Sequence, residues 1–290
     1  GPFLSTVPLA GALVDRAGSR SQREKYLGGI CEGTVRATVA LLEESAAWDP
    51  ASITLHAAET AAGLTLSGKK LFVTDADKAD LIIVAARAGS GLVLAIAERN
   101  APGITINPMP GIDELRPLFE VVCENVSIPE SQVLAAGDEA RKALGYAMDV
   151  ATLALSAEMV GGMQWILDAS VEYAKTRKQF GKPIGQFQAV QHHLADVLMM
   201  TESARSAVYY AAWAMGAEPE QAPLAVSIAK MYASDAYREA GNLGIQVHGG
   251  IGFTWDHEIH FYYKRAKSSE LMFGDAIFHR ERIAKRVVDE

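Results

Sequence analysis

The sequence predicts an α+β protein with a short helical part at its start, a central antiparallel β domain and a four-helix bundle at its end. The 290 residues are too many for one small core, and 49 % are apolar against 21 % charged, as in ordinary globular proteins. Short apolar runs separated by turn residues fill the stretch 34–132. The stretch 133–290 instead repeats its apolar residues at the period of a helix.

The predicted helical start covers residues 1–33. Ser21 and Glu24 have the spacing of a capping box, with Ser21 as the residue that caps the helix. Gly28-Gly29 would end this helix, because glycine is common just beyond a helix end. Few residues precede the β domain, so we expect this helical part to be incomplete.

The predicted β domain, residues 34–132, consists of short runs with Gly, Asp, Asn or Pro between them. A repeat of roughly ten residues is typical of an antiparallel barrel or sandwich. Ala88-Gly89-Ser90-Gly91 separates two of the runs and is interpreted as a hairpin turn. The runs are 35–42, 53–56, 64–66, 71–74, 81–85, 92–97, 104–106 and 120–128.

The predicted bundle, residues 133–290, contains four long helical segments. Gly181-Lys182-Pro183, Gly216 and Gly249-Gly250 mark the breaks between them. Helices of about 30 residues are long for globular proteins and suit a four-helix bundle. The segments are 138–176, 186–216, 219–248 and 256–288.

Charge and cysteine content exclude several classes of protein. The 35 acidic residues exceed the 27 basic ones, and a net charge of −8 disfavours general binding to nucleic acid. Cys31 and Cys123 have no metal-binding or disulfide spacing, which favours a reducing, cytoplasmic location. No uninterrupted apolar run reaches the roughly 18 residues of a membrane span, so we expect none.

Several familiar motifs fail on spacing. His257 and His260 are three residues apart, whereas the zinc-protease helix needs four. His192 and His193 are adjacent and would point in different directions on a helix. Gly89-Ser90-Gly91 lacks the rest of a dinucleotide fingerprint. We therefore expect no metal site.

Two other segments have a composition suited to a nucleotide. Residues 177–188 place a cation, an aromatic ring and amides around a helix break, and arginine can hold a phosphate with two parallel hydrogen bonds. Residues 246–254 contain Gly249-Gly250, where a backbone without Cβ atoms allows close approach of a ligand. Taken separately, Arg177 could equally be a solvated charge, and Gly249-Gly250 a helix cap.

Together and in this order, the two segments resemble the acyl-CoA dehydrogenase family. The stretches 121–129 and 252–267 are also similar to that family, so the resemblance spans nearly the whole chain. It implies FAD bound between subunits, with one β domain around the isoalloxazine and pyrophosphate and the neighbouring helical domain over the adenine half. It implies that the FAD contacts of this chain are Arg177, Phe180, Ile184, Gln188, Gln246, Gly249 and Gly250.

The chain departs from this family at the turn that cradles the flavin. An alignment anchored on residues 67–68 and 72–74 places the turn at 42–49, where Glu43, Ala46 and Asp49 match. Leu42 stands in place of a threonine and Trp48 in place of a serine, so two hydroxyl groups are lost. Glu44 replaces a proline and adds negative charge near the expected pyrophosphate. Thr74 matches, but a single contact cannot replace the turn.

The chain also departs at the catalytic base, a glutamate that removes the α-proton of the acyl-CoA. By the resemblance, the two positions used for this base hold Phe273 and Ala151, and the arginine that often follows the second aligns with Thr152. Neither phenylalanine nor alanine accepts a proton, so we predict no catalytic residue in this chain. The other carboxylates near these positions, for which we expect solvated or structural roles, are Glu158, Glu270 and Asp275.

Three hypotheses follow. The first is a subunit of a heteromeric, α2β2 acyl-CoA dehydrogenase acting on an acyl-CoA, such as a steroid side-chain CoA thioester. In that assembly the chain completes the FAD site of a catalytic partner subunit, and an electron-transfer flavoprotein is the expected acceptor. The second is a self-sufficient homo-oligomeric dehydrogenase with a relocated base. The third is a non-enzymatic assembly protein.

Overall fold

A computed structural model describes residues 1–89 and 91–288 and confirms the α+β class. The chain forms two compact units, Gly1–Ala151 and Thr152–Glu290. The division falls inside one long helix, α3 (Gly137–Thr176), whereas the sequence analysis begins the bundle at residue 133. Each unit has its own hydrophobic core.

The N-terminal helices belong to the first unit and correct the predicted cap. A π-helix (Ser5–Gly11) leads into α1 (Ala12–Ala17) and α2 (Arg20–Cys31). Ser19, rather than Ser21, caps α2. The Ser19 hydroxyl accepts from the backbone N–H of Gln22, and the Gln22 side chain accepts from the backbone N–H of Ser19. Gln22 also donates to two carbonyls before and within β8, a tertiary contact that sequence spacing cannot show. The helix continues through Gly28-Gly29 to Cys31.

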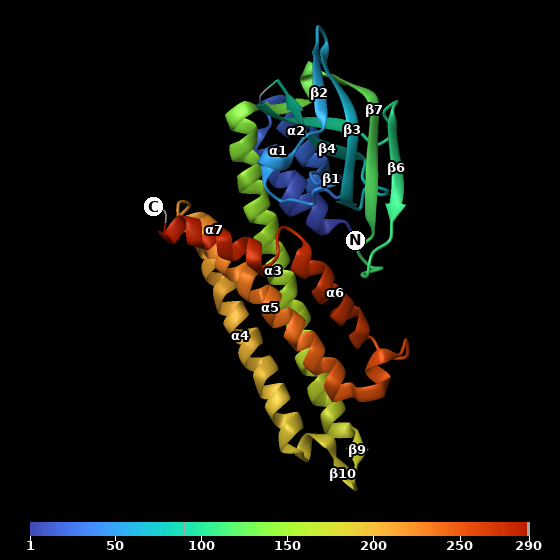
Figure 1. The fold of residues 1–290 in the computed structure, drawn as a ribbon, viewed down its shortest axis with the longest axis vertical. Helices are drawn as coiled ribbons and strands as arrows, with labels where there is room; N and C mark the ends of the chain where they lie inside the picture. The colour runs from blue at the N-terminus through green and yellow to red at the C-terminus, as the bar shows by residue number, and fades with distance from the viewer. Residues whose placement is uncertain (90, 289–290) are drawn as a thin grey trace. The chain divides into compact units, whose positions relative to one another are not determined.

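An eight-stranded sheet fills the rest of the first unit (Figure 1). Its order is β6-β7-β3-β2-β4-β5-β8, and β1 also pairs with β4. Most pairings are antiparallel, as predicted, and β4 pairs with β5 through Ala88 and Gly91; Ser90 of the predicted turn lies outside the described residues. The strands are β1 (Ala37–Ala40), β2 (His56–Thr60), β3 (Gly63–Thr74), β4 (Leu81–Ala88), β5 (Gly91–Glu98), β6 (Ile104–Met109), β7 (Leu118–Pro129) and β8 (Val133–Ala136).

Two pairings in this sheet are parallel, which corrects the expectation of a wholly antiparallel domain. β1 pairs with residues 81–84 of β4, and His56 of β2 pairs with Arg87 farther along the same strand. The segment 41–55 therefore leaves β4 and returns to it, with a short 3-10 helix (Pro50–Ser52) on the way. The sequence shows two apolar runs there, but no local signal tells which strand they join.

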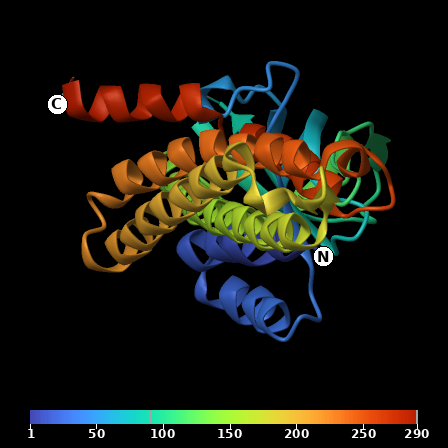
Figure 2. The same ribbon diagram turned by 90° about the horizontal axis from the view of Figure 1, so that it is seen from below.

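Long helices make the second unit, where the second half of α3, α4 (Gln188–Ala217) and α5 (Ala222–His248) lie side by side (Figures 1 and 2). Alanines on α5, such as Ala229 and Ala233, are fully buried and allow close helix packing. The predicted fourth segment is wrong as one helix. It divides into α6 (Ile259–Leu271) and α7 (Ala276–Val288). Two consecutive residues between them, Phe273 and Gly274, have positive φ values of 59° and 96°, which a helix cannot include.

Shorter elements connect these helices. A two-strand hairpin, β9 (Lys178–Gln179) with β10 (Lys182–Pro183), and a 3-10 helix (Ile184–Gln186) join α3 to α4. Another 3-10 helix (Gly249–Phe253) follows α5, and one (Glu130–Gln132) precedes β8. By length and composition α3 could cross a membrane, but 56 % of its most apolar window is buried within the protein, as in the core helix of a globular domain.

Candidate functional site

The first predicted nucleotide segment folds as the β9–β10 hairpin. The backbone N–H of Ile184 donates to the carbonyl of Arg177 at 2.8 Å and closes it. Phe180 and Gly181 form the turn with φ values of 53° and 80°, the left-handed pair that two-residue hairpins require. This turn holds the Phe180 ring 91 % exposed. Arg177 is also exposed, immediately after α3 ends.

Aromatic contacts fix the far end of the same hairpin. The rings of Phe180 and Phe187 meet edge to face, with centroids 6.0 Å apart. The ammonium of Lys182 lies 4.4 Å from the centre of the Phe187 ring, a cation–π contact. Gln188 follows as the first residue of α4 and is exposed. The hairpin thus presents a cation, a ring and an amide outward on a closed backbone.

The second predicted segment is the end of α5. Gln246 is exposed on the last turn, and the helix stops after His248 because Gly249 has a φ of 63°. Gly249 and Gly250 are exposed, and a Cβ added to either would meet no described atom within 4 Å. The backbone there is open to a ligand from outside.

Two rings that lie outside the predicted contacts join the segments. Tyr173, on the last turns of α3, stacks on His248 with ring centroids 4.5 Å apart and planes 25° apart. The backbone N–H of Arg177 donates to the carbonyl of Tyr173. The structure therefore brings together the segments that hold the seven predicted FAD contacts, of which Ile184 is half-buried and the others are exposed. The only sequence signal for the two rings is their position, because Tyr173 lies one helical turn before Arg177 and His248 directly precedes Gly249.

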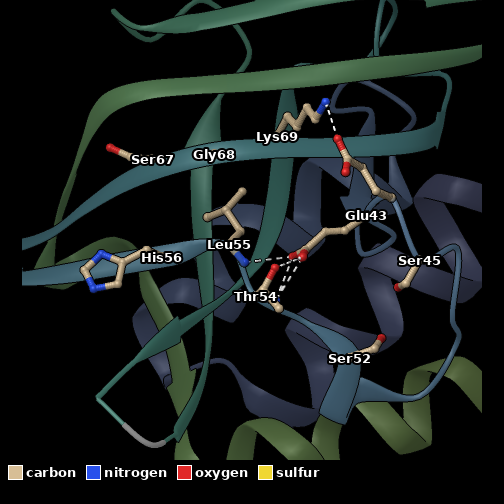
Figure 3. A pocket seen from close by; sticks show the side chains of 10 residues that line it. Glu43, Ser45, Ser52, Thr54, Leu55, His56, Ser67, Gly68 and Lys69 are labelled. Carbon is tan, nitrogen blue, oxygen red and sulfur yellow. Dashed lines mark hydrogen bonds and ion pairs between the residues drawn. The ribbon is translucent and has the colours of Figure 1, made fainter.

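The turn 42–49, which aligns with the family's flavin cradle, is organised around a carboxylate instead (Figure 3). Glu43 accepts hydrogen bonds from the backbone of Thr54 and Leu55 and, at 2.6 Å, from the fully buried ammonium of Lys70. Burial acts to raise the pKa of Glu43, but the hydrogen bonds led by that of Lys70 outweigh it and hold this pKa below its ordinary value. Beside it Glu44 pairs with Lys69 at 2.6 Å.

Both lysines next to this turn are thus paired with its glutamates. Lys69 lines a polar pocket of about 340 Å³ together with Glu43 and Glu44, and the charges of both lysines are neutralised by the chain itself. Trp48 is half-buried and packs into a small apolar pocket with Leu42 and Leu144. At the positions where the turn departs from the family, Glu44 adds a carboxylate and Trp48 a bulky ring, and neither suits the two phosphates of FAD. The outward-facing segments of the second unit fit the nucleotide half of FAD better, since their backbone is open and Arg177 is exposed.

The two base positions are both buried and apolar. Ala151 is fully buried, and Phe273 is 2 % exposed in the connection between α6 and α7. The carbonyl of Phe273 accepts from Nε2 of His279 at 3.1 Å. Burial, with the nearby Lys230 and Arg282, lowers the pKa of His279 to about 3, so its ring is neutral.

Lys230 of α5 holds the same connection from the other side. Its ammonium is fully buried and donates to Ser234 Oγ at 3.0 Å, the carbonyl of Glu270 at 3.1 Å and that of Gly274 at 2.8 Å. Burial lowers the pKa of Lys230 to about 7. The stretch that aligns with the family's base is therefore fixed by buried donors to its backbone.

The three remaining carboxylates each have a structural partner. Glu158 pairs with Arg265 at 2.9 Å, and Glu270 pairs with Arg238. Asp275 accepts from the backbone of Phe278 at 2.8 Å at the start of α7. Across the described residues, no group of three His, Cys, Asp or Glu could hold a metal ion.

Comparison with known sequences gives a consistent set of relatives. Residues 142–288 match the profile described as "Acyl-CoA dehydrogenase, C-terminal domain". The chain is 30 % identical to the probable acyl-CoA dehydrogenase YngJ of Bacillus subtilis, over 99 % of this chain and 77 % of that protein. It is 43 % identical to the acyl-CoA dehydrogenase IpdE2 of Mycobacterium tuberculosis over 42 % of this chain and 36 % of that protein. It is 30 % identical to the caffeyl-CoA reductase-Etf complex subunit CarC of Acetobacterium woodii, over 88 % of this chain and 69 % of that protein.

Solved structures agree in fold. Butyryl-CoA dehydrogenase from Megasphaera elsdenii superposes with a TM-score of 0.93 at 28 % identity, covering 99 % of this chain and 77 % of that one. A chain of the ChsE4-ChsE5 complex from Mycobacterium tuberculosis superposes with a TM-score of 0.90 at 28 % identity, covering 100 % and 76 %.

Proposed function

Because the chain belongs to the acyl-CoA dehydrogenase family, we propose that it is the subunit that completes the FAD site of a catalytic partner. Members of this family are flavin-dependent oxidoreductases that act on acyl-CoA, and FAD is their cofactor. FAD accepts hydride in this chemistry. In the proposed assembly the partner holds the flavin and supplies the base, and this chain contacts the adenine half.

The observation that carries the proposal is the difference between the two halves of the site. The hairpin and the α5 end are exposed and open, whereas the turn 42–49 carries the departures Glu44, which pairs with Lys69, and Trp48, which packs with Leu42 and Leu144. Phe273 and Ala151 provide no proton acceptor. A subunit that offered a nucleotide grip to a neighbour, and held no flavin itself, would have this distribution.

Each exposed residue has a role in the proposed grip. Arg177 would hold a phosphate oxygen with parallel hydrogen bonds, and the amides of Gln188 and Gln246 would bind polar atoms of the nucleotide. Phe180 offers a ring face for contact with the adenosine, and the half-buried Ile184 would add an apolar contact. Gly249 and Gly250 would let the backbone approach without steric obstruction.

The finer parts of the proposal concern partners and place. We propose an α2β2 assembly of this chain with a catalytic acyl-CoA dehydrogenase subunit, supported by the similarity to a ChsE4-ChsE5 chain. A steroid side-chain CoA thioester is the proposed substrate, and an electron-transfer flavoprotein the proposed acceptor, supported by the similarity to an Etf-complex subunit. Two cysteines without a disulfide support a cytoplasmic location.

Gly250→Ala tests the nucleotide grip directly. The added methyl group meets no described atom of the chain, so the subunit should fold unchanged, but it would obstruct a ligand that approaches the backbone. In the complex recovered through a tag on this chain, we expect FAD affinity to fall about tenfold, a change of about 1.4 kcal/mol. Gly216→Ala on α4 is the matched control, since its methyl group is equally unobstructed.

Equal FAD affinity in the two glycine variants, together with no effect of Arg177→Ala, would exclude the grip and favour a non-enzymatic assembly protein. Flavin counting gives a second measure: the heteromer should hold one FAD per pair of unlike chains. A self-sufficient dehydrogenase would instead be yellow when purified alone and would bleach with an acyl-CoA. The partners of Glu158, Glu270 and Asp275 speak against that alternative.

A further inference from the structure

His248 is nearly fully buried yet carries a polar atom that packing does not explain. His248 is only 3 % exposed, and its Nδ1 lies 2.8 Å from the carbonyl oxygen of Gly244. Because a carbonyl only accepts, Nδ1 carries the hydrogen. The other ring nitrogen, Nε2, is buried without a hydrogen-bond partner in the parts of the chain that the structure describes, 1–89 and 91–288. A buried acceptor without a donor lowers stability, so an apolar ring would pack here at less cost.

The position of this ring gives it a second task. One face of His248 stacks on Tyr173, and the ring of His257 lies against it with centroids 4.4 Å apart and planes inclined by 57°. His257 is itself fixed, because its Nδ1 accepts from the backbone of Ile259 at the start of α6. Tyr173 and His257 also meet edge to face at 6.4 Å. Three rings from α3, α5 and the segment before α6 therefore form one cluster.

The cluster connects the two nucleotide segments through short paths. His248 directly precedes Gly249-Gly250, and its Nδ1–H fixes the last turn of α5. The backbone N–H of Arg177 donates to the backbone carbonyl of Tyr173 at 2.8 Å. The start of the hairpin is therefore fixed to the residue on which His248 stacks. Burial lowers the pKa of His248 by more than its hydrogen bond to Gly244 raises it, and the neutral ring suits stacking against two other rings.

We propose that His248 is a positioning residue that holds the Gln246–Gly250 turn against Tyr173, so that this turn and the Arg177 hairpin act as one preformed grip for the adenine half of FAD. The inference rests on the proposed function, because it assigns a task within that grip. Preformed contacts bind more tightly than mobile ones, since less conformational freedom is lost on binding.

The test uses the tagged heteromer, stripped of flavin and titrated with FAD. His248→Ala removes the ring and should weaken FAD binding about tenfold, and Tyr173→Leu should give a similar loss from the other side of the stack. His248→Phe keeps a stacked ring and should restore FAD affinity to within about threefold of the wild type. The matched control is Tyr262→Ala, which breaks the equally close stack of Tyr262 on Trp165 in the same unit. It should lower the melting temperature and leave FAD affinity unchanged.

Coupling between substitutions separates positioning from general destabilisation. If His248 holds the hairpin in place, Arg177→Ala costs FAD affinity in the wild type but much less when His248→Ala is already present. Wild-type FAD affinity in both His248→Ala and Tyr173→Leu, with Arg177→Ala still harmful, would overturn the inference and leave the proposed function intact. If Tyr262→Ala weakened FAD binding as much as His248→Ala does, that result would likewise overturn the inference. Failure of Arg177→Ala and Gly250→Ala to alter FAD binding would reject the proposed function itself.

Discussion

Replacing Lys230 by methionine tests whether a buried ammonium holds the connection between α6 and α7. Methionine keeps an unbranched apolar stem but donates no hydrogen bond, so the carbonyls of Glu270 and Gly274 lose their partner. Each buried carbonyl left without a donor costs about 1–3 kcal/mol, which gives roughly 2–6 kcal/mol for the two. The substitution also removes the cost of burying a charge, which offsets part of this loss at neutral pH.

Because the cost of burying the Lys230 charge depends on its protonation, the stability difference between the wild type and Lys230→Met depends on pH. Burial lowers the pKa of Lys230 from 10.5 to about 7, so the unfolded chain binds a proton that the folded chain releases between these values. Stability contributed through this group therefore rises with pH across that window, by up to about 1.4 kcal/mol per pH unit. Between pH 7 and pH 9 the advantage of the wild type over Lys230→Met should grow by about 2 kcal/mol.

Urea unfolding of both proteins at pH 7, 8 and 9, followed by circular dichroism of the helices, measures this difference. Other titrating groups are the same in the two proteins and cancel in the comparison. A difference that stays constant over this range, or that shrinks as the pH rises, would refute the interpretation of Lys230 as a buried amine that loses its proton in the folded protein.

Two further substitutions test the contacts of the turn 42–49 and of the connection between α6 and α7. Glu43→Gln leaves the buried ammonium of Lys70 without its carboxylate and should lower the free energy of unfolding by about 3 kcal/mol in urea titrations. Because the pKa of Glu43 is held low, the contribution of its carboxylate to the free energy of unfolding is present above the unfolded pKa near 4.5. This contribution is lost as the pH falls through the folded pKa, so the loss of stability in Glu43→Gln should vanish in acid. Gly274→Ala places a methyl group 2.2 Å from Phe278 at a φ of 96° and should cost at least about 2 kcal/mol in the same assay, whereas Gly216→Ala should be neutral or slightly stabilising; equal stability of the two glycine variants would contradict the steric argument.

The sequence predicted the helices where punctuation was local. Gly249 ends α5 where a glycine pair had been noted, and the hairpin forms at Gly181-Lys182-Pro183. The break between α6 and α7 was missed because its cause is tertiary. Lys230, distant in sequence, donates to the backbone on both sides of Phe273, and no local pattern records that contact. The parallel pairing of β1 and β2 with β4 was missed for the same reason, since strand partners are not written in a strand's own residues.

In the candidate site too, contiguous motifs could be predicted and contacts between residues distant in sequence could not. The segments at Arg177 and Gly249 were recognisable because each motif is contiguous in sequence. The stack of Tyr173 on His248 was not, since it joins two helices far apart in the chain. Glu43 matches the family at its position, yet only the contacts with Lys70, Thr54 and Leu55 reveal that it serves the chain's own stability.

The route of residues 41–55 has a consequence for how such a subunit could arise. Since β1 and β2 border this excursion and both join β4, the residues that pair with β4 lie outside the excursion. The departures Glu44 and Trp48 lie in this connection and not in a paired strand. In the proposed heteromer, substitutions within this one connection would let a subunit give up the flavin cradle while the strands on either side of it keep their pairing with β4.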